Sequence, residues 1–162
     1  MRAPRPTRSA WENERSDRTI QPVLSPNQRK APVALTDRAR SLVEAAADAA
    51  ADKLATDIIA FDVSEQLAIT DAFLLCTASN DRQVRSVVDG IEERLRDLGA
   101  KPARREGQRE SRWVLLDYVD IVVHVQHTDE RLYYALERLW RDCPVVPLPE
   151  SVTAGSGARG NS

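Results

Sequence analysis

Four aspartates carry the clearest potential for chemistry in this sequence. Asp117 and Asp120 are three positions apart, Asp62 lies inside an apolar run, and Asp71 directly precedes another apolar run. Carboxylate oxygens are the side-chain ligands that Mg²⁺ prefers, usually together with the phosphates of a substrate. A site that joins the first pair to either of the other two could therefore hold a divalent cation for nucleotidyl transfer.

The evidence for such an enzyme is weaker than the evidence against it. A Ser79-Asn80 turn at a helix start could accept a phosphate, but no glycine-rich phosphate loop follows the preceding apolar run. Two aspartates in a turn are equally suited to capping backbone N–H groups. We therefore expect no enzymatic activity, and we keep a residual nucleotidyltransferase as the alternative.

The histidines and cysteines do not indicate a metal site. His124 and His127 are three positions apart, but strand side chains alternate and the two need not point the same way. Cys76 and Cys143 are far apart and show no Cys-x-x-Cys spacing. We expect no metal, no disulfide framework and no cofactor.

Trp113 and Tyr118 favour a binding function. Both lie near the expected ends of strands and beside acidic residues. Amphipathic aromatic side chains in such places often anchor protein interfaces.

These residues belong to one expected β-hairpin. Two apolar runs rich in β-branched residues, 113–116 and 121–125, flank a short polar stretch, residues 117–120. Apolar runs without alternation are typical of strands covered on both faces. We expect the bend to present two carboxylates, a phenol and an indole at one margin of the sheet.

Three helices and two further strands should frame the hairpin. Thr36 can cap a helix that runs to about residue 54, and Asn80 with Gln83 resembles a capping box for a helix over residues 81–98. Residues 58–63 and 72–77 are expected strands, and residues 99–112 a connecting loop with at most a short extended piece. Thr128 should cap a third helix.

The last expected helix has an apolar stripe that we predict to be buried. The stripe comprises Leu132, Ala135, Leu136 and Leu139.

The resulting order of elements is α-β-β-α-β-β-α, a mixed sheet flanked by helices. A strand-helix-strand crossover through residues 81–98 should leave its two strands parallel.

Charge separates the chain into three parts. Residues 1–34 hold five of the nine prolines and no periodic apolar face, which predicts a disordered extension. Residues 149–162 are expected to form a disordered tail. Residues 35–150 hold 15 bases and 22 acids, a net charge of −7.

An acidic domain suits a basic protein partner better than nucleic-acid phosphates. We therefore expect little direct RNA contact, and we interpret Arg104 and Arg105 as solvated loop charges. No run approaches the roughly 20 apolar residues of a membrane span, and the N-terminus has no apolar signal-peptide core. A cytoplasmic protein without a membrane partner is expected.

Several of these segments together resemble one family. The segments are Thr70 to Phe73, Ser79 to Val84, Glu106-Gly107, the hairpin with its sequence Asp-Tyr-Val-Asp-Ile-Val-Val-His, and Leu132-Tyr133 with Leu136 to Trp140. Over residues 35–148 the chain resembles the ribosomal silencing factor family, also called Iojap-like.

The resemblance implies a fold, a partner and a set of contact residues. The implied fold is nucleotidyltransferase-like α/β without catalytic activity. The implied partner is the large ribosomal subunit, bound through its universal protein number fourteen, so that the small subunit is excluded and translation falls under nutrient limitation. Whether the chain forms a homodimer when it is not bound to the ribosome is left open. The implied contact residues are Trp113, Leu116, Asp117, Tyr118 and Asp120.

Overall fold

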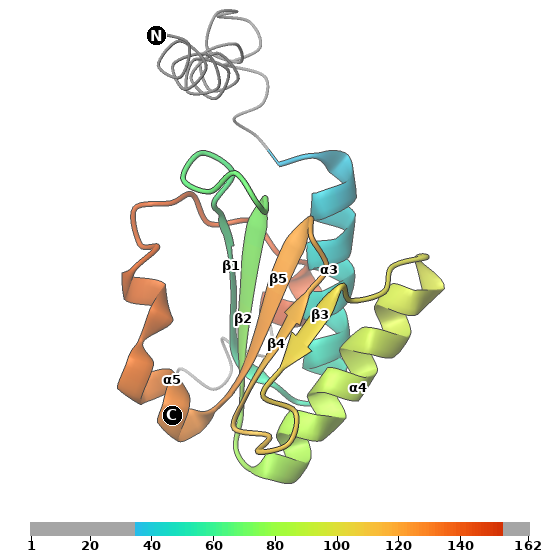
Figure 1. The fold of residues 1–162 in the computed structure, drawn as a ribbon, viewed down its shortest axis with the longest axis vertical. Coiled ribbons are helices and arrows are strands. Elements are labelled where there is room, and N and C mark those ends of the chain that lie inside the picture. The colour runs from blue at the N-terminus through green and yellow to red at the C-terminus, as the bar shows by residue number, and fades with distance from the viewer. Residues whose placement is uncertain (1–34, 154–162) are drawn as a thin grey trace, which may run out of the picture. The chain divides into compact units, whose positions relative to one another are not determined.

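The structure, a computed structural model, describes residues 35–153 except the side chains of Tyr133 and Tyr134 (Figure 1). The disorder predicted for residues 1–34 and 154–162 lies outside the described residues. The described order is α3 (Asp37–Asp52), β1 (Thr56–Asp62), β2 (Ala72–Ala78), α4 (Asp81–Asp97), β3 (Arg104–Glu106), β4 (Trp113–Asp117), β5 (Ile121–His127), α5 (Thr128–Tyr134) and the 3-10 turn η2 (Leu136–Arg138).

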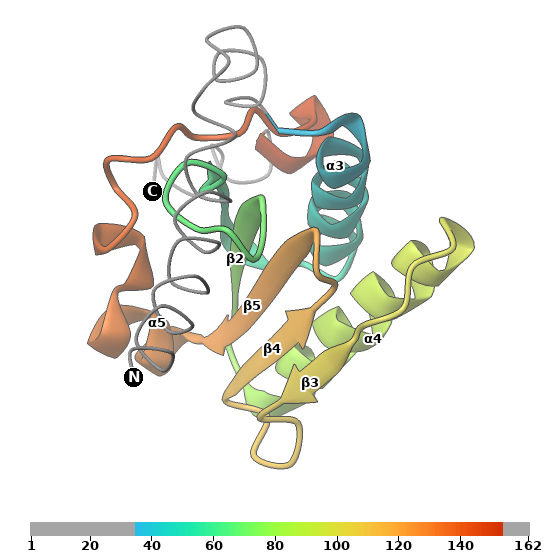
Figure 2. The same ribbon diagram turned by 45° about the horizontal axis from the view of Figure 1, so that its top comes forward.

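The strands form one mixed five-stranded sheet in the order β1-β2-β5-β4-β3. β2 and β5 are parallel, and the other three neighbouring pairs are antiparallel. This confirms a mixed α/β fold with helices packed on the sheet. α3 and α4 lie on one side of the sheet, and α5 lies on the other (Figures 1 and 2).

Local sequence signals account for the two long helices. The Thr36 side chain accepts a hydrogen bond from the Ala39 N–H at 3.0 Å and so starts α3. At the start of α4, Asn80 Oδ1 accepts from the Gln83 N–H at 2.8 Å, and the side-chain Oε1 of Gln83 accepts from the Ser79 N–H at 2.7 Å. Gly99, with φ of 81°, follows α4. The predicted caps and stop are confirmed.

The main core lies between the sheet and these two helices. Alternate side chains of the central strands point to this side, as the twofold periodicity of a strand requires. Leu74, Leu116, Ile121 and Val123 are fully buried there, against Leu42 of α3. The many alanines of α3 allow it to approach the sheet closely.

The first strand after α4 is not the one that pairs with β2. The helix leads into β3, a three-residue edge strand in the segment expected to be a loop, and β5 is the parallel neighbour of β2. Since β3 is antiparallel to β4, and β4 to β5, β3 nevertheless runs in the same direction as β2. The strand connected to β2 by the helix is thus parallel to it without being adjacent.

The buried stripe predicted for the last helix is wrong. Leu132 is 75% exposed and Leu139 is 70% exposed. Ala135 adopts the left-handed conformation, with φ of 47°, so the helix ends at Tyr134 and its periodicity is lost. Arg131, which is 7% exposed, lies against the sheet instead and donates to the Thr77 hydroxyl at 2.7 Å.

Two smaller expectations also need correction. The side chain that caps α5 is His127, whose Nδ1 accepts from the Asp129 N–H at 3.1 Å, and not Thr128. The first residues of the expected tail are ordered, because Val152 is 2% exposed and the Ser151 hydroxyl bonds to Asp48 at 3.0 Å. The apolar Val152 is part of the same core as the buried face of α3.

Candidate functional site

We define the hairpin face as the side of β4 and β5 that points away from α3 and α4. Its side chains alternate with those of the main core. Those from β4 are half-buried, whereas those from β5 are buried. Since α5 packs against β2 and β5, β4 keeps the more accessible part of this face. The hairpin face comprises Trp113, Leu115 and Asp117 of β4 with Val122, His124 and Gln126 of β5.

Aromatic rings form the centre of the hairpin face. The Trp113 indole N–H donates to His124 Nδ1 at 3.1 Å. The Phe73 ring meets His124 edge-on at a centroid distance of 5.2 Å and Trp140 at 5.1 Å. These contacts fix the indole and the imidazole in one arrangement, because each ring has neighbours that restrict its rotation.

Burial keeps His124 neutral. The side chain is 6% exposed, and loss of hydration lowers its pKa to about 4. Nδ1 accepts the indole N–H, so the ring proton of the neutral imidazole lies on Nε2. The histidine therefore serves as a hydrogen-bond acceptor for Trp113 at neutral pH.

The bend between β4 and β5 is tight and strained. Val119 has φ of 74°, which is unfavourable for a β-branched residue. The Asp120 N–H donates to the Tyr118 carbonyl at 2.8 Å, the three-residue hydrogen bond of a γ-turn. The strained Val119 side chain is 57% exposed at the tip.

The two acids of the bend have different environments. Asp117 Oδ1 accepts from the Val119 N–H at 2.8 Å, and its Oδ2 lies 3.8 Å from the Arg104 guanidinium. One of its oxygens thus stabilises the turn, as the sequence allowed. Asp120 is half-buried, and its carbonyl accepts from the Asp71 N–H at 3.0 Å, which ties the bend to the start of β2.

Two of the five predicted contact residues are buried. Leu116 is fully buried in the main core, and Tyr118 is 6% exposed. Burial raises the pKa of the Tyr118 phenol to about 12. The expectation that the bend presents this phenol at the surface is wrong, because Tyr118 points to the helix side of the sheet. Trp113, Asp117 and Asp120 keep partial exposure.

The aspartates considered for a cation do not form a cluster. Within residues 35–153, no group of three His, Cys, Asp or Glu residues could hold a metal ion. Asp62 Oδ1 accepts from the Ser64 N–H at 3.0 Å, and Asp71 accepts from the Thr36 hydroxyl at 3.3 Å. Hydrogen bonding within turns and caps is the role that the structure gives these carboxylates.

Sequence reasoning missed three residues of this surface. Leu115 and Leu116 are neighbours in β4, so their side chains must point to opposite faces of the sheet. This rule alone would have predicted that only one of the two leucines belongs to this surface. From the sequence, His124 is weighed only as a metal ligand, although it pairs with Leu115 and lies diagonal to Trp113 on the same face, within reach of an aromatic side chain. No signal in the sequence predicted positive φ at Val119, since valine disfavours it.

The fold and this surface define a small mixed α/β protein with an aromatic and acidic sheet face. The family model described as "Ribosomal silencing factor during starvation" matches residues 36–161. The chain therefore belongs to the ribosomal silencing factor family, which places it among regulators of translation that act on the ribosome.

Individual relatives agree with this assignment. Ribosomal silencing factor RsfS of Bacillus subtilis is 42% identical over 109 residues, which is 67% of this chain and 92% of that protein. The chloroplastic protein Iojap of Zea mays is 31% identical over 106 residues, 64% of this chain and 45% of that protein.

Solved structures share the fold. A crystal structure of a Bacillus halodurans protein has a TM-score of 0.59 and 37% identity, covering 67% of this chain and 98% of that one. A Chromobacterium violaceum protein has a TM-score of 0.60 and 31% identity, covering 62% of this chain and 83% of that one.

None of the helices in residues 35–153 is long and apolar enough to cross a membrane.

Proposed function

We propose that the chain binds the large ribosomal subunit through its universal protein number fourteen and excludes the small subunit by steric blocking. Translation would fall in this way under nutrient limitation, in the cytoplasm. The observation that carries the proposal is the hairpin face, where half-buried Trp113 and Leu115 lie beside Asp117 on a domain of net charge −7. Aromatic and apolar area next to acids suits a basic protein partner.

The five predicted contact residues take two kinds of role in this proposal. Trp113 supplies contact area, while Asp117 and Asp120 pair with Lys or Arg of the partner. Leu116 and Tyr118 act from beneath, because their buried side chains hold β4 and the bend in position. A homodimer of the free chain that used the same face would compete with the ribosome for it.

The proposed action needs no catalytic step. We retain the nucleotidyltransferase-like character of the fold as part of the proposal, with the acids used for caps and turns instead of catalysis. The hydrogen bonds of Asp62, Asp71 and Asp117 to hydroxyl and backbone N–H groups support this. Magnesium-dependent nucleotide transfer by the wild-type chain would contradict it.

Co-sedimentation with purified large subunits tests the proposal directly. Wild-type chain should travel with large subunits on a sucrose gradient and prevent joining when small subunits are added. Trp113→Ala should cost about 1–3 kcal/mol of binding free energy, mainly through faster dissociation. Asp120→Lys should slow association, most strongly at low salt.

Asp89→Lys is the matched control for charge. Asp89 is exposed on α4, on the far side of the sheet from the hairpin face. This variant should bind and block joining like wild type, and melting curves verify that every variant is folded. If Asp89→Lys loses binding while folded Asp120→Lys and Trp113→Ala keep it, the interface lies on α4 and the proposed surface is wrong.

A further inference from the structure

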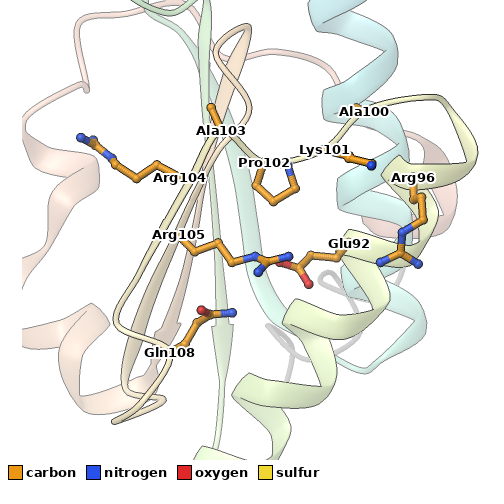
Figure 3. Close-up of a pocket in the computed structure, with 9 residues that line it drawn as sticks. All are labelled: Glu92, Arg96, Ala100, Lys101, Pro102, Ala103, Arg104, Arg105 and Gln108. Atoms are coloured by element: carbon orange, nitrogen blue, oxygen red, sulfur yellow. The ribbon is translucent and has the colours of Figure 1, made fainter.

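A second surface with a different charge lies at the free edge of the sheet. A cleft of about 530 Å³ opens between the C-terminal half of α4 and β3 (Figure 3). Its charged lining residues are Arg96, Lys101, Arg104 and Arg105 against a single acid, Glu92. A local excess of cations on a domain of net charge −7 is not explained by overall composition.

Half of these four cations are not neutralised within the described part of the fold. Arg104 pairs with Glu106 at 3.3 Å and with Asp117 at 3.8 Å. Arg105 Nε bonds to Glu92 at 2.6 Å, and both side chains point toward each other across the cleft (Figure 3). Arg96 and Lys101 form no ion pair with any residue in the described part of the chain. Two free cations and the unused terminal nitrogens of a guanidinium therefore face the cleft.

A buried hydroxyl lies beneath the same cations. Tyr118 OH is buried and has no hydrogen-bond partner among the described residues. The charged groups that act on it are Glu92, Arg105 and Arg96, all three of which line the cleft. Arg105 is paired with Glu92, so this unsatisfied buried donor lies near one unpaired cation, Arg96, and a bound water would satisfy it.

The lining chemistry selects among anions. The cleft contains no aromatic side chain on which a base could stack, and its apolar residues are Ala100, Pro102 and Ala103. Nucleotide and single-strand sites that hold bases use aromatic platforms, whereas guanidinium and ammonium groups alone recognise phosphate. The cleft thus fits the backbone of a nucleic acid better than a free nucleotide.

We infer that this edge cleft binds the phosphodiester backbone of ribosomal RNA next to the protein contact. β3 joins the two surfaces, because Arg104 reaches Asp117 on the hairpin face while Arg105 points into the cleft (Figure 3). The source of the RNA rests on the proposed function, since a basic ribosomal protein is surrounded by RNA. The expectation of little direct RNA contact, drawn from net charge, would then fail at this edge.

The test uses the full chain and a pair of double variants. Arg96→Gln with Lys101→Gln removes the two unpaired cations of the cleft. Arg40→Gln with Arg82→Gln is the matched control, because these arginines lie on α3 and the start of α4 without ion-pair partners in the described residues. Melting curves address the competing explanation that Arg96 only stabilises the C-terminus of α4.

Binding to purified large subunits is measured from 50 to 200 mM KCl. Each phosphate contact contributes about 0.7–0.9 to the slope of log affinity against log salt. The cleft variant should therefore lower the slope by about 1.4–1.8, while the control keeps the wild-type slope. Binding to the isolated universal protein number fourteen should be unchanged in both variants.

Protein-free large-subunit RNA separates this inference from the proposed function. If wild type does not bind subunits but binds this RNA with a slope that falls in the cleft variant, the proposed function fails and the cleft inference stands. Equal slopes for the folded cleft variant and its control, on subunits and on RNA, would overturn the inference. The inference would also be overturned if the cleft variant, but not its control, lost binding to the isolated universal protein number fourteen.

Discussion

The two faces of the sheet use the same strands for opposite purposes. On the helix side, β4 and β5 contribute Val114, Leu116 and Val123, all buried in one apolar core. On the hairpin face the same strands carry aromatic, polar and half-buried residues, with hydrogen bonds in place of close apolar packing. Stability should therefore reside on one face and recognition on the other.

Neighbouring leucines of β4 provide the largest contrast. Leu116→Ala should lower the free energy of unfolding by about 2–5 kcal/mol, because a fully buried leucine leaves a cavity. Leu115→Ala, on the half-buried hairpin face, should cost roughly 1 kcal/mol or less and weaken large-subunit binding. Urea unfolding of both variants measures the difference. Equal losses of stability would show that the two faces are not energetically distinct.

Acid should destabilise the fold through the hairpin face. His124 is neutral in the folded chain down to pH of about 4, its lowered pKa, whereas the unfolded chain takes up this proton below about 6.5. Between these two pH values the unfolded state binds more protons than the folded state. The contribution of His124 to the free energy of unfolding is therefore complete above pH 6.5 and is lost as the pH falls to 4. The expected loss is about 3 kcal/mol.

His124→Gln is the comparison that isolates this loss, because the carboxylates titrate in both proteins. The free energy of unfolding is measured by urea at pH 7, 6, 5 and 4.5. The wild-type curve should fall more steeply than that of the variant. Parallel curves would mean that the pKa of His124 is not lowered in the fold.

A substitution in the bend should change the free energy of unfolding by a smaller amount and in the opposite direction, towards higher stability. Val119→Asn should raise the free energy of unfolding by about 1 kcal/mol, because asparagine tolerates the positive φ that strains valine. The same change removes an exposed apolar side chain from the tip and should weaken subunit binding. Thermal melting and co-sedimentation are the measurements. A lower melting temperature would show that the valine side chain stabilises the bend.

Tyr118→Phe should have the smallest effect. It removes only a buried hydroxyl that has no partner in the described residues, so stability should stay within about 0.5 kcal/mol of wild type. Urea unfolding checks this, with Tyr118→Ala as the contrasting variant, since loss of the ring leaves a cavity. A marked loss in Tyr118→Phe would reveal a hydrogen bond through bound water.

Local signals in the sequence predicted most of the elements. The caps at Thr36 and Asn80, the stop at Gly99 and the two hairpin strands depend on interactions within a few residues, and all of them are present. The family, too, was reached from the sequence, because its motif residues lie in short continuous segments. Such features need no knowledge of the distant chain.

Features that depend on distant contacts were decided by the tertiary structure. Alternation in β4 leaves open which face meets the helices, so only packing against α3 and α4 buried Leu116 and Tyr118 and left Trp113 and Leu115 on the hairpin face. The helical period predicted burial of Leu132 and Leu139, but Arg131 lies against the sheet in place of Leu132, and the left-handed Ala135 ends the helix before Leu139.

The edge cleft shows the same division for charge. The sequence determined a net charge of −7 for residues 35–150, and that sum predicts a basic partner for the domain as a whole. Only the fold brought Arg96 of α4 and Lys101 to the same cleft as Arg105 of β3. Electrostatic interactions weaken with distance and are screened by salt, so the local arrangement of charges, which composition does not contain, decides what each surface binds.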